Sequence, residues 1–231
     1  MRLDKYLCKS TDLTKSEAVE RIQNGEVNVN SETVTDESTQ VHENNTVLLN
    51  DKRLTARPFR YLLMNKPAGT VCSNIDEVYP SLFRYLDIEN VSELHIAGRL
   101  DADTTGLVLI TSDGDWSHKI TSPRHQKYKV YLIETEQPIT DEMCEQLTDG
   151  VMLHGEKSAT KPAIVEKIAD YSMRLSIYEG KYHQVKRMLA AVDNRVVALH
   201  REKIGTVALD PNLAPGEYRP LTQHEIETIS S

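Results

Sequence analysis

A polar segment at residues 98–107, GRLDADTTGL, carries an arginine, two aspartates and two threonines at the start of an apolar run. Loops that leave a rigid sheet commonly hold catalytic groups, because the sheet fixes their positions. The carboxylates of Asp101 and Asp103 could act as a nucleophile or as a proton acceptor. The same residues could instead form a plain turn, in which Asp and Thr side chains bond to free backbone amides. The segment is therefore the first candidate for an active site.

Two carboxylates in one segment also suggest glycoside hydrolysis. If the segment is extended, residues two apart share a face, so Asp101 and Asp103 lie close together. Leu100 and Ala102 then line the opposite face. An acid and a water-activating base need a wider separation than this. A hydrolase therefore fits the spacing poorly.

A second candidate is a predicted helix over residues 182–192, with an apolar face made of Val185, Met188, Leu189 and Val192. Lys186 projects roughly 100° from Val185, at the edge of that face. Its ammonium group could stabilise an ionised Asp101 in a pocket from which a bound nucleobase excludes water. Alternatively, Lys186 covers the core with its aliphatic stem. The helix could thus supply a cation to the first segment.

Segment 98–107 resembles the catalytic motif of the bacterial ribosomal pseudouridine synthases, in which the Asp after Arg-Leu is essential. By this resemblance Asp101 is the catalytic carboxylate, and Asp103 occupies a variable position. Other segments resemble the family's remaining motifs: NKPAG at 65–69, HQKYKVYL at 125–132, EGKYHQVKRM at 179–188, and a C-terminal pattern of LHREKIG at 199–205 with LAPGEYR at 213–219. The resemblance implies an enzyme that converts uridine in RNA to pseudouridine without a cofactor or a metal ion.

The resemblance also assigns roles to single residues. Lys186 follows Gln-Val in its motif, which implies that it pairs with Asp101. The family's Lys-x-Tyr aligns with residues 129–131, so Tyr131 is expected to stack on uracil, with Tyr128 as a competing register. The target uridine must leave its base stack to reach such a site. The substrate and RNA contacts expected in this domain are Arg99, Thr105, Lys181, His183, Gln184, Arg187, Leu199 and Arg201.

The first sixty residues resemble an S4 domain, an RNA-binding module known from a ribosomal protein. The resemblance rests on RLDK at 2–5, SEA at 16–18 and GEVNVN at 25–30. The residues that it implies face the RNA backbone are Arg2, Lys5, Lys15 and Arg21. Residues 1–60 nevertheless carry a net charge of −1. We therefore expect weak general affinity, with specificity that depends on RNA shape.

Local patterns predict the elements of this first unit. They are a short helix near Leu3, a helix that begins with a Thr14–Glu17 capping box and ends near Gly25, and strands at 26–29 and 47–49. The polar stretch from about residue 51 to 60 is expected to be a linker. A small S4-like α/β module thus precedes the larger domain.

The pattern of apolar runs in residues 61–231 predicts an α+β domain, which is the catalytic domain by the family resemblance. Apolar runs at 61–64 and 107–110 indicate buried strands, and 173–177 alternates as a half-buried strand does. Helices are expected at 140–148 and 182–192. The prediction is a mixed, mainly antiparallel sheet flanked by helices and loops.

Composition limits the partners. The net charge of −8 argues against general nucleic-acid binding, but residues 179–203 carry a local charge of +3, which permits RNA contact. Three widely separated cysteines indicate reduced thiols without a disulfide framework or a zinc-ligand pair. The chain shows neither a long apolar run nor a secretion signal. We therefore expect a cytoplasmic protein without a membrane partner.

The function expected from the resemblance is modification of a uridine in 16S ribosomal RNA, of the uridine-516 type. The expected partner is this RNA or an assembling small-subunit particle, and the expected enzyme is a monomer. Whether Asp101 attacks as a nucleophile or removes a sugar proton is left open. One alternative is a synthase of the same family that acts on 23S ribosomal RNA. Another is a non-catalytic RNA-binding or ribosome-assembly factor.

Overall fold

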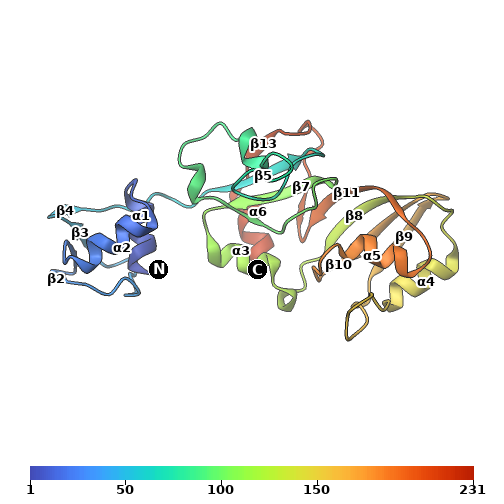
Figure 1. Ribbon diagram of the computed structural model, residues 1–231, viewed down its shortest axis with the longest axis horizontal. Helices are drawn as coiled ribbons and strands as arrows, with labels where there is room; N and C mark the ends of the chain where they lie inside the picture. The colour runs from blue at the N-terminus through green and yellow to red at the C-terminus, as the bar shows by residue number, and fades with distance from the viewer. The chain divides into compact units, whose positions relative to one another are not determined.

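The computed structural model describes residues 1–231, which fold into two compact units, Met1–Phe59 and Arg60–Ser231 (Figure 1). The first unit contains α1 (Leu3–Ser10), α2 (Lys15–Gln23), β1 (Val27–Val29), β2 (Glu32–Thr33), β3 (Val47–Leu49) and β4 (Lys52–Arg53). The second contains β5 (Tyr61–Lys66), η1 (Leu82–Tyr85), η2 (Val91–Glu93), β6 (His95–Ala97), β7 (Thr105–Thr111), α3 (Gly114–Thr121), η3 (Pro123–His125), β8 (Lys129–Thr135), α4 (Asp141–Asp149), β9 (Ile164–Ala169), β10 (Ser172–Ile177), α5 (Gln184–Ala191), β11 (Val196–Ile204), β12 (Val207–Ala208), β13 (Tyr218–Pro220) and α6 (Gln223–Ser230). None of the helices is both long enough and apolar enough to cross a bilayer.

Two helices pack against a four-stranded sheet of order β2-β1-β3-β4 in the first unit. Their shared core consists of Leu3, Leu7, Ala18, Ile22, Val27, Val41 and Val47. The predicted capping box of α2 is confirmed. The Glu17 amide donates to Thr14 Oγ1, and the Thr14 amide donates to the Glu17 carboxylate. Gly25, with a φ of +75°, follows the end of α2 as predicted.

The prediction of a linker from residue 51 onward was wrong. Lys52 and Arg53 form β4, which pairs with β3, and Leu54 packs against the core of the unit. Asn50 and Asp51 both have positive φ angles, 48° and 65°. This is the conformation of a two-residue hairpin turn, which a polar composition alone does not distinguish from a linker.

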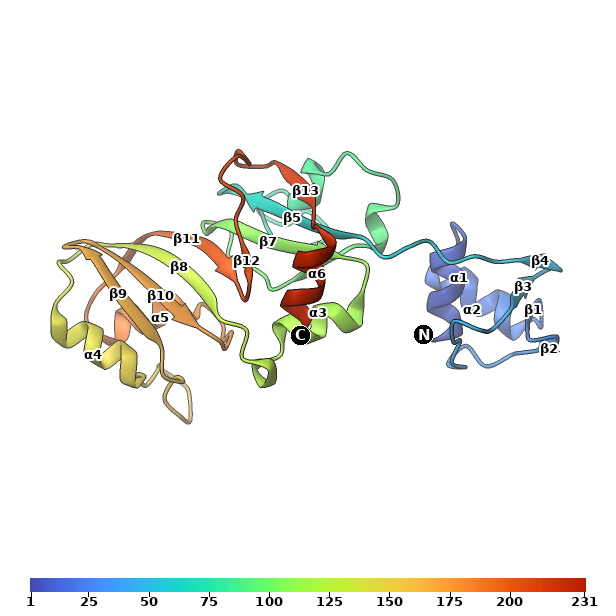
Figure 2. The ribbon, with the colours of Figure 1, turned by 180° about the vertical axis from the view of Figure 1, so that it is seen from behind.

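The second unit is built on one large sheet of order β13-β5-β7-β11-β8-β10-β9, with β6 beside β7 and β12 beside β11 (Figure 2). The β7–β11 pair is parallel, and every other strand pair of the sheet is antiparallel. The predicted mixed, mainly antiparallel sheet is therefore confirmed.

Strands β5 and β7 are buried on both faces. Leu62 and Val108 point into the larger core, which includes α4 and α5. Leu63 and Leu107 point into the smaller core, which α3 and α6 cover side by side (Figures 1 and 2). Because neither face meets water, these strands read in the sequence as continuous apolar runs.

The two predicted helices of this unit are present. The helix expected at 140–148 is α4, capped by Thr140, whose hydroxyl accepts from the Met143 amide. The helix expected at 182–192 begins at Gln184, two residues later than predicted. His183 precedes it with a φ of +47°, a left-handed conformation that cannot belong to the helix.

Candidate active site

Asp101 lies on a turn that connects β6 to β7. The Thr104 amide donates to the Asp101 carbonyl oxygen at 3.2 Å, so residues 101–104 bend and are not extended. The bend brings the carboxylates of Asp101 and Asp103 to the same side chain, Lys186. Carboxylates that share one cation lack the separation that an acid and a water-activating base require.

Lys66, at the end of β5, binds the backbone of this turn from the interior of the unit. Its side chain is fully buried, and Nζ donates to the carbonyl oxygens of Pro67 at 3.1 Å, Ala102 at 3.2 Å and Thr104 at 2.8 Å. Burial lowers the pKa of Lys66, although attraction to Cys72, Asp103 and Asp101 opposes the shift. The contacts with Ala102 and Thr104 fix the backbone on either side of Asp103, and the contact with Pro67 ties that backbone to the end of β5.

The side chain of Lys186 reaches the turn from α5. Its Nζ lies 3.0 Å from Asp101 Oδ2, and 2.6 Å and 2.9 Å from the two carboxylate oxygens of Asp103. The side chains of Asp101 and Lys186 are each 29% exposed, whereas that of Asp103 is 72% exposed. Lys186 therefore lies half-buried beside Asp101, as the family resemblance implied.

Electrostatic coupling is visible in the pKa values of this cluster. Burial alone would lower the pKa of Lys186, but hydrogen bonds and attraction to Asp103 and Asp101 raise it above its usual value. Burial alone would raise the pKa of Asp103, but Lys186 lowers it. A cation at Lys186 and an anion at Asp103 are therefore both stabilised at neutral pH.

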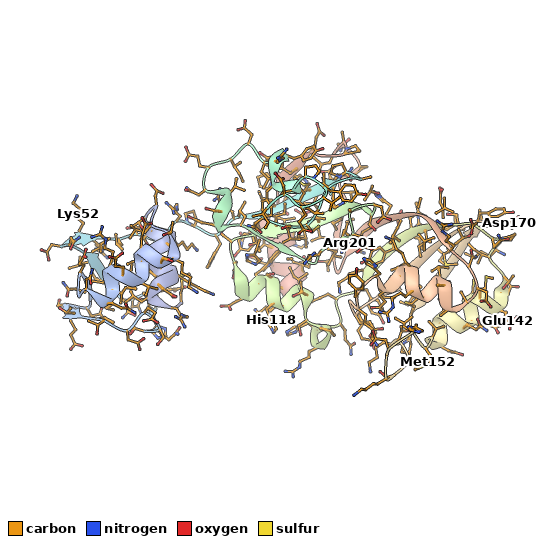
Figure 3. The ribbon with its side chains drawn as sticks, viewed as in Figure 1. Lys52, His118, Glu142, Met152, Asp170 and Arg201 are labelled. Carbon is orange, nitrogen blue, oxygen red and sulfur yellow. The ribbon has the colours of Figure 1, made fainter.

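Arg201 lies in the interior of the unit (Figure 3) and binds the backbone at the start of the same turn. Its Nε donates to the Leu107 carbonyl oxygen at 2.8 Å, and Nη2 donates to that of Gly98 at 2.7 Å. The pairing that places it there requires Gly106, where a Cβ would lie 2.4 Å from the Arg201 carbonyl oxygen. Arg201 is thus buried inside the scaffold, where it is shielded from solvent.

Tyr131 is buried on β8, opposite Arg201 on β11. Its hydroxyl oxygen lies 3.5 Å from Arg201 Nη1. Tyr128, the competing register, packs edge-on against Tyr178 with ring centroids 5.3 Å apart. Arg201 contacts the Tyr131 hydroxyl and also binds the Gly98 carbonyl oxygen, at the start of the turn that carries Asp101. Tyr131 is therefore linked to this turn, whereas Tyr128 packs against Tyr178.

Lys129, on the same face of β8 as Tyr131, is a second buried lysine. Burial and repulsion from Arg201 lower its pKa to about 8, although attraction to Glu179 opposes this shift. Its Nζ donates weakly to the Lys127 carbonyl oxygen, at 3.4 Å. The interior near Tyr131 therefore contains little that compensates a positive charge.

Several predicted contact residues serve the scaffold in this structure. Thr105 Oγ1 lies 2.8 Å from His200 Nδ1, and Leu199 is nearly buried in the core. Gln184 is buried and donates to Glu179 Oε1 at 2.6 Å. Arg99, in contrast, is exposed.

The predicted contacts Lys181 and Arg187 meet at Glu156. Lys181 Nζ lies 3.1 Å and Arg187 Nη1 lies 3.2 Å from its carboxylate oxygens. Arg187 Nη2 also donates to the His154 carbonyl oxygen at 2.7 Å. Both cations therefore hold the 151–160 loop against the start of α5.

His183, another predicted contact, lies beside Asp101, with Nε2 3.5 Å from Asp101 Oδ1. The motifs predicted a phosphate contact at His183 and no role for Lys66 or Tyr182. Lys66 stood in a recognised motif, NKPAG, but its burial depends on carbonyl groups nearly forty residues away. No group of three or more His, Cys, Asp or Glu side chains is placed to bind a metal ion.

In the first unit, the four predicted RNA contacts divide into two kinds. Arg2 is paired with buried Asp4 at 3.1 Å, and Arg21 with Glu26 at 3.0 Å. Lys5 and Lys15 are exposed and form no ion pair. Lys5 and Lys15 are therefore the cations of this set that are free to meet a phosphate.

Comparison with known proteins agrees with the motifs. Residues 60–191 match the family described as RNA pseudouridylate synthase, and residues 1–47 match the S4 domain. The chain is 48% identical over 230 residues to Ribosomal small subunit pseudouridine synthase A of Haemophilus influenzae, with 99% of each chain covered. The protein of that name from Escherichia coli K12 is also 48% identical, with 99% of this chain and 100% of the relative covered. A crystal structure of a pseudouridylate synthase, 47% identical, aligns over 99% of both chains with a TM-score of 0.74. The chain therefore belongs to the RNA pseudouridylate synthase family and carries an S4 domain.

Proposed function

We propose that this chain isomerises a uridine of 16S ribosomal RNA, of the uridine-516 type, to pseudouridine. The observation that carries the proposal is the half-buried Asp101 carboxylate, 3.0 Å from the Lys186 ammonium, on a turn that buried cations fix from below. The two relatives, which match over their whole length, are named as small-subunit synthases. Their names support the small-subunit RNA as the substrate.

The reaction breaks the N1–C1′ bond of uridine and joins C1′ to C5 of the same uracil. The C5 hydrogen leaves as a proton, and N1 gains one, so the mass of the RNA does not change. Asp101 either attacks the ribose or removes a proton from it. Both routes use one carboxylate, and the Lys186 ammonium nitrogen lies 3.0 Å from that of Asp101. Because uracil is not released, a second carboxylate that activates water has no part in this scheme.

The other residues are proposed to hold the substrate. Tyr131 offers its ring to the flipped-out uracil, and Arg201 keeps that ring beside the turn. Exposed Arg99 contacts the phosphate backbone near the turn. In the S4 domain, Lys5 and Lys15 contact phosphates weakly, because the unit carries little net charge. One copy of the chain contains all of these residues, so a monomer suffices.

The test is release of tritium from RNA labelled at C5 of uridine. The purified chain is assayed on 16S transcript, 23S transcript and isolated small-subunit particles. Wild type should release tritium from a 16S substrate, and Asp101→Asn should fold normally but release none. Carbodiimide modification followed by primer extension should then locate the pseudouridine in the transcript. The same mapping of ribosomal RNA from cells with and without this chain should show the modified position in vivo.

Each other outcome identifies a different function. Activity confined to 23S transcript would leave the chemistry intact but contradict the small-subunit assignment. Appearance of free uracil would indicate a hydrolase. Absence of turnover on every RNA, with tight binding to a small-subunit particle, would indicate a non-catalytic assembly factor. Full turnover by Asp101→Asn would remove Asp101 from the chemistry.

A further inference from the structure

Tyr182 is a large aromatic residue held in solvent close to the active site. It is 77% exposed and belongs to none of the apolar cores. One face of its ring stacks on His183, with ring centroids 3.8 Å apart and an interplanar angle of 23°. The high exposure leaves the other face of Tyr182 open to solvent.

The stack is connected to the reacting group. His183 Nε2 lies 3.5 Å from Asp101 Oδ1, on the opposite carboxylate oxygen from Lys186. Asp101, His183 and Tyr182 therefore follow one another outward from the half-buried carboxylate to solvent.

The backbone holds both rings in place. His183 has a φ of +47°, which is uncommon for a residue other than glycine and persists only where the surroundings enforce it. The Lys181 amide donates to Gln184 Oε1 at 2.8 Å, and Arg187 donates to the Tyr182 carbonyl oxygen at 3.0 Å. Hydrogen bonds therefore hold the backbone on both sides of the exposed ring.

The cations close to Tyr182 are paired with carboxylates. Residues 181–187 contain three cations, Lys181, Lys186 and Arg187, and no acid. Glu156 neutralises part of this charge, and Asp101 and Asp103 pair with Lys186. The surroundings of Tyr182 therefore favour stacking over a strong phosphate clamp.

We propose that the open face of Tyr182 is the binding site for the nucleobase adjacent to the modified uridine. The inference rests on the proposed function, because extrusion of a uridine deprives its neighbour of a stacking partner. Aromatic side chains commonly take that place in the recognition of single-stranded RNA, whatever the base. His183 supports the platform and fixes its distance from Asp101.

The test combines variants of Tyr182 with substrates that lack one base. The RNA is a fragment of 16S ribosomal RNA that contains the mapped uridine. Two further fragments carry an abasic nucleotide on its 5′ or its 3′ side. Tyr182→Ala should lower kcat/KM on the intact fragment by about tenfold, within the range of base–aromatic stacking. Tyr182→Phe should stay within about twofold of wild type, because it keeps the ring.

The abasic substrates separate stacking from a structural effect. On the fragment that lacks the stacked base, wild type should fall to the level of Tyr182→Ala, and the variant should lose nothing more. Tyr171→Ala is the matched control, because Tyr171 is also an exposed tyrosine but lies in the turn directly before β10, at the end of that strand remote from Tyr182. This control should match wild type on every fragment.

Two results would overturn the inference while wild type remains active. One is a Tyr182→Ala variant with wild-type kcat/KM on the intact fragment. The other is a tenfold loss that persists on both abasic fragments, which would mean that Tyr182 acts through the fold. If wild type makes no pseudouridine in any ribosomal RNA, the proposed function itself fails, and the two failures are thereby distinguished.

Discussion

The ammonium nitrogen of Lys186 lies 3.0 Å from Asp101 Oδ2, although the two residues stand 85 positions apart in the chain. The contact joins the turn before β7 to α5. Lys186 also binds Asp103, so one cation faces two carboxylates. The charge at Lys186 is therefore the feature of the site that substitution can test most directly.

Replacing Lys186 with methionine keeps the length of the side chain and removes its charge. We expect kcat to fall by about 100-fold, because the charge beside Asp101, the proposed catalytic carboxylate, is lost. KM should change less than threefold, because the lost charge is expected to act on the reaction and not on RNA binding. Lys186→Arg, which retains a cation, should recover part of kcat. A variant with normal kcat and a raised KM would show that Lys186 binds RNA and does not assist Asp101.

Asp103→Asn removes the second carboxylate and leaves Asp101 paired with Lys186. We expect tritium release within about threefold of wild type, because isomerisation uses a single carboxylate. Lys186 lowers the pKa of Asp103, so the native pair favours its charged form, and that contribution is lost as pH falls through the pKa. Near-complete loss of activity in Asp103→Asn would support a mechanism with two carboxylates.

Lys66→Met should weaken both the fold and the activity. Of the three backbone carbonyl oxygens that bind Lys66, that of Thr104 would lose its donor inside the protein, whereas those of Pro67 and Ala102 keep bonds from Thr70 Oγ1 and the Gly69 amide. Buried polar groups left without partners cost about 1–3 kcal/mol each, and some of this is recovered by relaxation. We expect the free energy of unfolding in urea to fall by about 1–3 kcal/mol, because one carbonyl oxygen is left unpaired, and kcat to fall with it. Lys119→Met, on an exposed helix position, should change neither quantity.

Local sequence patterns predicted the features whose causes are local. The capping box at Thr14 and the position of Lys186 on its helix follow from short spacings, and both are confirmed. The start of α5 was predicted two residues early, because the residue types around His183 do not indicate its positive φ angle. The hairpin turn at Asn50 was predicted to be a linker for a similar reason, because polar residues are common in both turns and linkers.

Contacts between distant segments could not be predicted in this way. The interaction of Arg187 with Glu156 joins residues 31 positions apart, so Arg187 read equally well as a phosphate contact or a solvated charge. The burial of Lys66 depends on the turn after Asp101, which the extended interpretation of residues 101–103 missed. The family motifs supplied the pairing of Lys186 with Asp101 that spacing alone left undecided.

The acid stability of the catalytic unit should depend on Glu225. Its hydrogen bond to Arg219, with bonds from Thr222, lowers the pKa of Glu225 to about 2 against the opposing effect of burial. Stability from a lowered carboxyl pKa is present above the unfolded value, near 4.3, and is lost as pH falls toward 2. Glu225→Gln should therefore lower the free energy of unfolding by roughly 2–3 kcal/mol at pH 7. The deficit should shrink between pH 4.5 and pH 3.

The control for this prediction is Glu227→Gln, on the exposed side of the same helix. It should leave the free energy of unfolding unchanged at every pH. A deficit in Glu225→Gln that stays constant from pH 7 to pH 3 would mean that the glutamate contributes through packing and not through its charge.

Lys129→Met should stabilise the protein. With a folded pKa of about 8 and an unfolded pKa near 10.4, the ammonium group is disfavoured by folding. The resulting destabilisation is fully present below pH 8 and disappears as pH rises through 10.4. The free energy of unfolding of Lys129→Met should thus exceed that of wild type by roughly 3 kcal/mol at pH 7. This excess should decrease between pH 8 and pH 10.

Urea titrations of both proteins across this range measure the excess directly, with Lys119→Met as an exposed control that should show none. A less stable Lys129→Met at pH 7 would mean that the buried ammonium is well compensated, contrary to its single long hydrogen bond. If the variant gains stability but loses tritium release, the cation beside Tyr131 is retained for the reaction at the expense of the fold. This outcome is expected where active sites keep charges that folding disfavours.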